Sequence, residues 1–159
     1  MKNLKNEVLS LIGKTVTFKR IAGNTIILYF DGRPGELNVK SLWIDPPWHC
    51  EINKMCIVDS EEFPFEQEVW ESEKDYERKF NEICNKTNDL LGAKIDNIKI
   101  EDGSNSISLY FNNEQVLVNT IDTMDVEGWI YRDNVNNRQI VAFIGRLEVI
   151  VNGGEVDSP

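Results

Sequence analysis

The only histidine of the chain, His49, has carboxylates and a thiol as close neighbours, the side chains that acid–base and nucleophilic catalysis use. Asp45, Cys50 and Glu51 all lie within four residues of it. In an extended segment His49 and Cys50 point to opposite faces, so they cannot form a cysteine–histidine pair with each other. A catalytic partner from a distant part of the chain remains an open alternative.

The cysteines and the motif content limit the chemistry further. Cys50, Cys56 and Cys84 are an odd number in a sequence without a recognisable export signal, which favours reduced structural thiols over a disulfide framework. Cys50 and Cys56 have no second close pair that would complete a zinc site, so we expect no metal and no cofactor. The sequence has no glycine-rich phosphate loop, no G-x-S-x-G elbow and no H-E-x-x-H motif. These observations argue against an enzyme.

The acidic residues are concentrated in one segment. Residues 59–77 contain nine acids and one base, so they carry −8 of the net charge of −10. Such a field repels nucleic acid and acidic membranes and attracts basic partners. We therefore expect a basic protein partner, no nucleic acid and no membrane, with a partner-binding surface made of Glu66, Glu68, Glu71, Glu73, Asp75 and Glu77. An ordinary solvated helix face is the alternative.

The stretch from residue 43 to residue 50 is a second candidate surface. Pro46 and Pro47 cannot donate hydrogen bonds to a sheet, so they predict a rigid elbow between two tryptophans. The elbow, a candidate ligand site or surface, would consist of Trp43, Trp48, His49 and Trp129. Alternatively, the tryptophans belong to the core and the prolines end a strand.

The two halves of the sequence resemble each other. Gly13 falls on Gly92 at an offset of 79 residues, and residues 26–30 fall on residues 107–111 at an offset of 81. The second offset also aligns a tryptophan of each half. We interpret this as a duplicated unit, although two strand-rich segments with glycine turns can also look alike by chance.

Hydrophobic periodicity predicts the elements of each unit. A helix over 3–12 would end at Gly13, and a long acidic helix from 65 or 66 to 91 would end at Gly92. Strands are predicted at 15–21, 25–30, 36–42, 50–58, 94–100, 106–111, 115–120, 128–132, 139–144 and 146–151. The predicted fold class is α+β: a duplicated helix-plus-antiparallel β-meander unit with an internal pseudo-twofold, joined by the long acidic helix.

We expect a first repeat unit at 1–60, a linking helix at 61–92, a second repeat unit at 93–152 and a disordered tail at 153–159, all within one compact domain. No segment of the sequence approaches about 18 uninterrupted apolar residues, the length that crosses a membrane. The start, with Lys2 and Lys5, lacks the apolar run of a signal peptide. The expected location is the cytoplasm.

Several short motifs resemble one group of bacterial proteins. They are L-[IL]-G at 11–13 and 90–92, L-Y-F at 28–30 and 109–111, P-W-H at 47–49 before Ile57–Glu61, and Gly128-Trp129. The sequence resembles small immunity-like proteins encoded near polymorphic-toxin loci, in which an arginine tends to follow the P-W pair where this chain has His49. The resemblance covers nearly the whole chain and implies a cytosolic protein that blocks a toxin by occluding it.

Two hypotheses for function follow. The first is an intracellular protein-binding protein, an immunity protein that neutralises a basic toxin by occlusion through the six acidic residues named above. The second is a small-molecule-binding or enzymatic β-domain that uses the elbow of Trp43, Trp48 and His49 together with Trp129.

Overall fold

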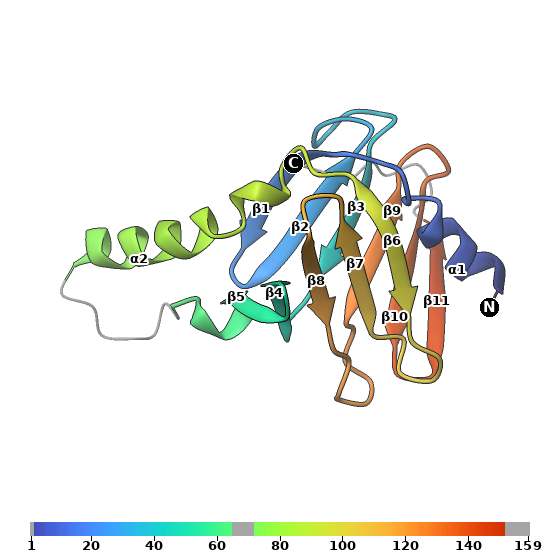
Figure 1. Ribbon diagram of the computed structural model, residues 1–159. Helices are drawn as coiled ribbons and strands as arrows, with labels where there is room; N and C mark the ends of the chain where they lie inside the picture. Colours follow the sequence, from blue (N-terminus) through green and yellow to red (C-terminus); the bar gives the residue numbers. More distant parts are fainter. Residues whose placement is uncertain (1, 65–71, 152–159) are drawn as a thin grey trace.

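Two antiparallel sheets contain most of the regular secondary structure of the chain (Figure 1). The computed structural model describes residues 2–64 and 72–151. One sheet has six strands in the order β1-β2-β3-β9-β10-β11, and the other has five in the order β5-β4-β8-β7-β6. The strands are β1 (Val16–Ala22), β2 (Thr25–Phe30), β3 (Lys40–Ile44), β4 (Trp48–Ile52), β5 (Met55–Asp59), β6 (Ile95–Ile100), β7 (Ile107–Phe111), β8 (Gln115–Asn119), β9 (Trp129–Asp133), β10 (Arg138–Phe143) and β11 (Arg146–Val151). With its helices, the fold is α+β, as the sequence predicts.

Alternation along the strands places the main core between the sheets. In β2 every second side chain belongs to this core, whereas Ile27 and Tyr29 face the other way and join a smaller cluster with Val39. The main core combines side chains of both sheets, among them Leu28, Leu42, Trp129 and Ile140 from the six-stranded sheet and Trp48, Leu109 and Leu117 from the five-stranded sheet. Burial on both faces explains why the strand β2 has the continuous apolar sequence I-I-L-Y-F.

Each sheet takes strands from both ends of the chain. In the six-stranded sheet β3 pairs with β9, which places Leu42 opposite Tyr131. In the five-stranded sheet β8 pairs with β4, which places Leu117 opposite Cys50. The expected units 1–60 and 93–152 therefore both contribute strands to both sheets.

The two sheets meet where β1 and β6 begin. Thr15 and Lys94 form an isolated antiparallel bridge. Beside it the Gly13 amide donates to the Ile95 carbonyl oxygen at 2.7 Å. Gly13 and Gly92 have φ values of 89° and 85°, in the left-handed region that favours glycine. The left-handed backbone predicted at both glycines is confirmed, but neither glycine ends an α-helix, since the helices stop earlier, at Leu9 and Asn85.

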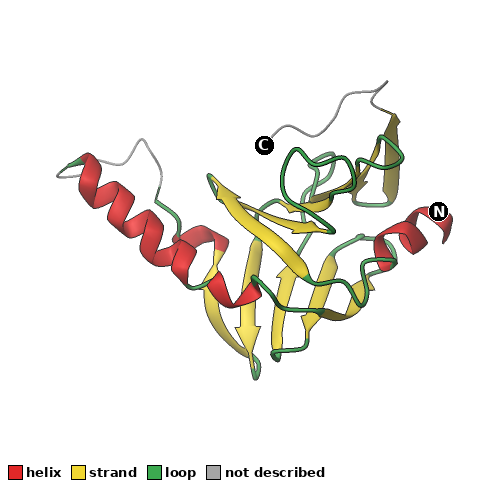
Figure 2. Cartoon of the chain, turned by 90° about the horizontal axis from the view of Figure 1, so that it is seen from above, coloured by secondary structure: helices red, strands yellow, loops and turns green. Residues whose placement is uncertain are grey.

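The helices lie at opposite sides of the sheets (Figures 1 and 2). α1 (Lys2–Leu9) is shorter than the predicted helix over 3–12, and turns follow it. α2 (Glu73–Asn85) begins after Ser72, whose side chain accepts a hydrogen bond from the Asp75 amide. None of the helices in the two described ranges is both long and apolar enough to cross a lipid bilayer.

The prediction of one helix to residue 91 is wrong at its end, and part of it lies outside the described residues. α2 stops at Asn85, and a short 3-10 helix, Asn88–Leu90, follows. Thr87 interrupts the helix because its hydroxyl donates to the Cys84 carbonyl oxygen, which offers the backbone a local alternative. Residues 65–71 of the predicted helix and the predicted tail at 153–159 are not described.

Two strand predictions also need correction. The single strand predicted at 50–58 is a hairpin of β4 and β5, since Asn53 and Lys54 adopt φ values of 52° and 66° at the turn. The strand predicted at 36–42 begins only at Lys40. Before it the chain turns, with the Val39 amide donating to the Glu36 carbonyl oxygen at 3.4 Å.

Candidate functional site

The acidic residues expected to bind a partner are only partly described. Glu66, Glu68 and Glu71 lie outside the described residues. Glu73 and Glu77 are exposed on α2, whereas the half-buried Asp75 accepts a hydrogen bond from the Arg78 guanidinium at 3.3 Å. Neither Glu73 nor Glu77 forms an ion pair with another residue of 2–64 or 72–151. Their carboxylates are therefore accessible to a cationic partner.

The described part of the helix carries less charge than the segment as a whole. α2 contains four acids and three bases, a net charge of −1. The remainder of the negative charge of residues 59–77 comes from the residues before the helix. Any cationic partner would therefore be attracted to the whole segment that leads into α2 and not to the helix alone.

The 3-10 helix Ser60–Glu62, which follows β5, contributes further carboxylates. Asp59 and Glu62 form a capping box, and the Glu62 carboxylate also accepts a hydrogen bond from Lys86 at 2.9 Å. Partial burial opposes ionisation of Glu62, but the hydrogen bonds from Lys86 and the Asp59 amide leave its pKa below the ordinary value. Glu61 is exposed and has no ion pair within the described chain. Of these three acids, Glu61 is the one that faces solvent unpaired.

A row of aromatic rings connects α2 to the core. The ring centroids of Tyr76 and Phe80 are 6.3 Å apart, those of Phe80 and Phe63 are 5.5 Å apart, and those of Phe63 and Trp48 are 6.0 Å apart. Phe63 and Trp48 are buried, whereas Tyr76 and Phe80 are half-buried. This packing holds the middle of α2, at Phe80, against the core, while the charged side chains of the exposed helix face point to solvent.

The elbow predicted from Trp43, Trp48, His49 and Trp129 does not form one site. Trp48 is 1% exposed and Trp129 is 0% exposed. Their indole nitrogens donate to the carbonyl oxygens of Asn24 and Asn105, both at 2.7 Å. The alternative that these two tryptophans belong to the core is confirmed, and the alternative of an accessible surface is wrong for them, because large aromatic side chains fill the core and their N–H groups find backbone partners there.

The other two residues of the elbow lie on different sheets. Trp43 is half-buried on β3, with the guanidinium carbons of Arg20 and Arg132 at 5.7 and 4.2 Å from its ring centroid. His49 is half-buried on β4, and its Nε2 lies 3.0 Å from a carboxylate oxygen of Glu51. Trp43 and His49 are therefore separate surface features, and the structure does not bring the four residues together.

The thiols are not arranged for chemistry within the described part of the chain. Burial raises the pKa of Cys50 to about 12, which keeps it protonated. In residues 2–64 and 72–151 no three histidine, cysteine or acidic side chains are grouped as a metal ion would require. Cys50 is fully buried in the main core, so it is a core residue.

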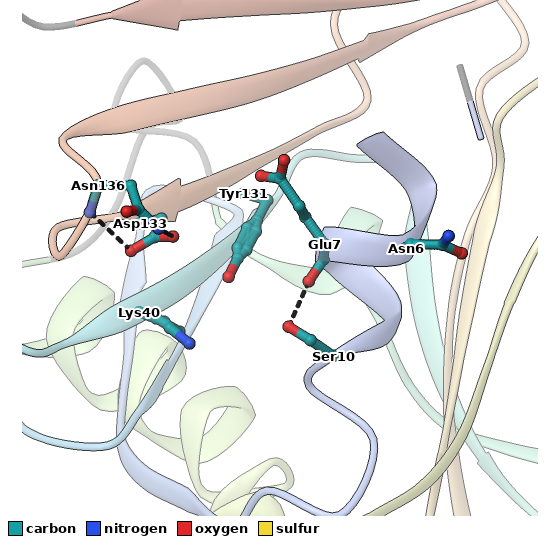
Figure 3. A pocket seen from close by; sticks show the side chains of 7 residues that line it. All are labelled: Asn6, Glu7, Ser10, Lys40, Tyr131, Asp133 and Asn136. Carbon is teal, nitrogen blue, oxygen red and sulfur yellow. Dashed lines mark hydrogen bonds between the residues drawn. The ribbon is translucent and has the colours of Figure 1, made fainter. Parts of the chain in front are cut away.

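A polar pocket that the sequence analysis missed lies between α1 and the six-stranded sheet (Figure 3). Its volume is about 490 Å³. It is lined by Asn6, Glu7, Ser10, Lys40, Tyr131, Asp133 and Asn136. Glu7 forms an ion pair with Arg138 of β10, which holds α1 at the rim of the pocket. In Figure 3 Tyr131 lies between Lys40 on one side and Glu7 and Ser10 on the other.

Asp133 and Tyr131 line the pocket from β9. The Asp133 carboxylate accepts hydrogen bonds from the Val135 amide at 3.0 Å and from the Asn136 side chain at 2.7 Å. Tyr131 is 2% exposed, and burial, followed by the negative charge of Asp133, raises the pKa of its hydroxyl. The neighbouring Ser10 hydroxyl partly offsets this rise in the pKa. Tyr131 therefore stays neutral and able to donate a hydrogen bond at physiological pH.

One sequence signal for this pocket exists. In each of the strands β3, β9 and β10, or directly at its end, a charged residue lies two positions from an apolar core residue: Lys40 from Leu42, Asp133 from Tyr131 and Arg138 from Ile140. The alternation that points these apolar side chains inward therefore also points the three charged side chains inward. In the structure Asp133 is opposite both Lys40 and Arg138 in the strand register. The signal is visible only once the pairing of β3, β9 and β10 is known.

Comparison with protein-family models, with curated proteins and with solved structures finds no match to this chain. Conclusions about function therefore depend on the geometry and charge described above.

Proposed function

We propose that this chain is an intracellular binding protein that occludes a basic protein partner, in the manner of an immunity protein that neutralises a basic toxin. The observation that carries the proposal is the location of the charge: residues 59–77 hold −8 of the net −10. Clustered carboxylates accelerate association with a cationic surface and disfavour anionic partners.

The accessibility of the described acids supports this proposal. Glu61, Glu73 and Glu77 are exposed, and none of them forms an ion pair with a residue of the described ranges. Binding a basic partner would therefore not require the loss of an existing ion pair at these three positions. The aromatic packing from Tyr76 to Trp48 supports a docking surface held in a fixed position, which reduces the entropy lost on binding.

We also propose that the fold is a duplicated unit with an internal pseudo-twofold. The strand orders β1-β2-β3-β9-β10 and β6-β7-β8-β4-β5 support it. When the two orders are aligned, the strand numbers at every position differ by five, so β1 corresponds to β6 and β9 corresponds to β4. Two pairs of equivalent hydrogen bonds add support. The Gly13 amide donates to the Ile95 carbonyl oxygen, as the Gly92 amide does to that of Val16. The Trp48 indole donates to the Asn24 carbonyl oxygen, as the Trp129 indole does to that of Asn105. β11 has no counterpart among the strands of the first half.

The binding proposal can be tested with the product of the gene directly upstream. If that gene encodes a secreted toxin with a variable C-terminal domain, the purified domain and the full-length chain are mixed and their affinity is measured by biolayer interferometry at several salt concentrations. We expect binding that weakens steeply as salt rises, because exposed charges are screened.

Two charge-reversal variants with the same net charge locate the binding surface. In the first, lysine replaces Glu66, Glu68, Glu71, Glu73, Asp75 and Glu77. In the second, lysine replaces six exposed acids elsewhere, namely Glu36, Asp89, Asp96, Glu101, Glu114 and Asp122. We expect the first variant to lose binding by at least about a hundredfold and the second to retain most of it. Equal losses in both, or intact binding by the first, would refute the proposed surface.

A further inference from the structure

The pocket between α1 and the six-stranded sheet is separate from the acidic surface. Its lining residues come from α1, from Ser10, from β3, β9 and the residues after β9, and none of them belongs to residues 59–77. Its volume of about 490 Å³ falls within the range of roughly 300–1,000 Å³ that is usual for small-ligand sites. The chemistry of its lining indicates which ligand it suits.

The charges of the pocket balance one another. Glu7 is paired with Arg138, and Asp133 stands opposite both Lys40 and Arg138 in the strand register. The lining contains two acids, Glu7 and Asp133, and one base, Lys40, and Arg138, which pairs with Glu7 without lining the pocket, brings the local sum of charges to zero. A ligand of either sign would gain little Coulomb attraction there, and an anion would also be repelled by the net charge of −10 on the whole protein.

The remaining polar groups supply both donors and acceptors. The Lys40 side chain has no hydrogen-bond or ion-pair partner among the described residues, so its ammonium group can donate to a ligand. The neutral Tyr131 hydroxyl can donate and accept, and the Ser10 hydroxyl, whose proton is donated to the Glu7 carbonyl oxygen, can accept. The Glu7 carboxylate can accept beyond its ion pair with Arg138. A ligand hydroxyl has the same dual character, so neighbouring hydroxyls of one ligand could each find a partner.

We propose that this pocket binds a small neutral carbohydrate of one or two rings. Lys40 and Tyr131 donate hydrogen bonds to its hydroxyl oxygens, and Glu7 accepts from its hydroxyl groups. The three side chains come from three different elements, α1, β3 and β9, so the site depends on the arrangement of the sheet and the helix. This inference is independent of the proposed binding of a basic protein.

The test is a titration of the isotope-labelled full-length chain followed by NMR. The probes are methyl α-glucoside, methyl β-galactoside and maltose, with glycine as a zwitterion and acetate as an anion. We expect at least one sugar to give saturable shifts at the backbone amides of Ser10, Lys40, Tyr131 and Asn136, and glycine and acetate to give none there. Absence of saturable shifts with all three sugars, or saturation by glycine or acetate in their place, would overturn the proposal.

Two pairs of variants check the assigned roles. Lys40→Met and Tyr131→Phe should each weaken sugar binding by about tenfold or more, since each removes a hydrogen bond to the ligand. Lys14→Met, which breaks the ion pair of Lys14 with Asp31 outside the pocket, and Tyr110→Phe on β7 should bind as the parent does. Unchanged sugar binding by Lys40→Met would refute the role of the ammonium group. Lys40 is only half-buried, so Lys40→Met should fold and still tests the proposal if Tyr131→Phe does not fold. The reversal of the six acids of residues 66–77 should leave sugar binding intact.

Discussion

The indole nitrogen of Trp129 donates a hydrogen bond of 2.7 Å to the carbonyl oxygen of Asn105 inside the core. Replacing Trp129 with phenylalanine removes the donor, leaves a buried carbonyl oxygen without its partner and opens a cavity. We expect Trp129→Phe to lower the free energy of unfolding by about 2–4 kcal/mol. Urea denaturation followed by circular dichroism measures this loss. The matched variant Trp43→Phe, at a half-buried ring on the outer face, should lose less unfolding free energy than Trp129→Phe. An equal loss of unfolding free energy in both variants would contradict the assignment of Trp129 to the core.

Lys19 joins β1 to the segment after α2. Its ammonium group donates to the Thr87 hydroxyl at 2.7 Å and to the Asn88 side-chain oxygen at 3.2 Å. Burial lowers the pKa of Lys19, so the cost of desolvating its charge offsets part of the stabilisation that these hydrogen bonds provide. We expect Lys19→Met to cost about 1 kcal/mol and to speed hydrogen exchange at residues 83–90. Lys99→Met, at an exposed position on β6, is the control, and comparable exchange in both variants would show that Lys19 does not secure the segment.

Tyr131 predicts a loss of stability at alkaline pH. Burial raises the pKa of its hydroxyl above the ordinary value of 10.0, so the folded state keeps the proton that the unfolded state releases. Above about pH 10 the unfolded state therefore binds fewer protons, and the free energy of unfolding falls as pH rises, by up to about 1.4 kcal/mol per pH unit. We expect Tyr131→Phe to have a shallower decline above about pH 10 in urea unfolding. Tyr110→Phe, at an exposed tyrosine, should decline as the parent does; the same slope in all three proteins would refute this origin.

The three thiols should react in a fixed order. Cys56 is exposed, although partial desolvation and the negative charge of Asp59 raise its pKa, whereas Cys84 is half-buried and Cys50 is buried. We expect iodoacetamide to modify Cys56 first and Cys84 more slowly, and Cys50 only after unfolding. Peptide mass spectrometry over time measures the order. Modification of Cys50 in the native protein at the rate of Cys56 would contradict its placement in the core.

Local patterns in the sequence predict much of the fold. The pair of β1 and β2, the strands β7, β10 and β11, and the left-handed Gly13 and Gly92 all follow from alternation and turn residues within a few positions of each other. The hairpin of β4 and β5 was missed because its turn, Asn53-Lys54, has no glycine or proline, although both residues have positive φ. The cap at Ser72, where α2 begins, could not be predicted because acidic and apolar residues continue in a helical pattern across it in the sequence.

Features that depend on distant pairing could not be predicted. The pocket needs β3, β9, β10 and α1 together, and nothing in the sequence around Lys40 or Asp133 indicates that they are neighbours. The core alternative for Trp48 and Trp129 was available from the sequence, but their hydrogen-bond acceptors, the carbonyl oxygens of Asn24 and Asn105, were not, because each acceptor is 24 residues away from its tryptophan. Periodicity identifies which face of an element is apolar, but it does not identify what covers that face.

The exchange of strands between the two sheets has a consequence for biosynthesis. Ile44 of β3 pairs with Trp129 of β9, 85 residues further along, so the six-stranded sheet cannot be completed until most of the chain has left the ribosome. A nascent polypeptide ending at residue 60 would hold β1–β3 without their neighbour β9 and the β4–β5 hairpin without β8. With so many pairings of high contact order, the protein should fold slowly and only after synthesis, and two separately translated halves should become ordered only on meeting each other.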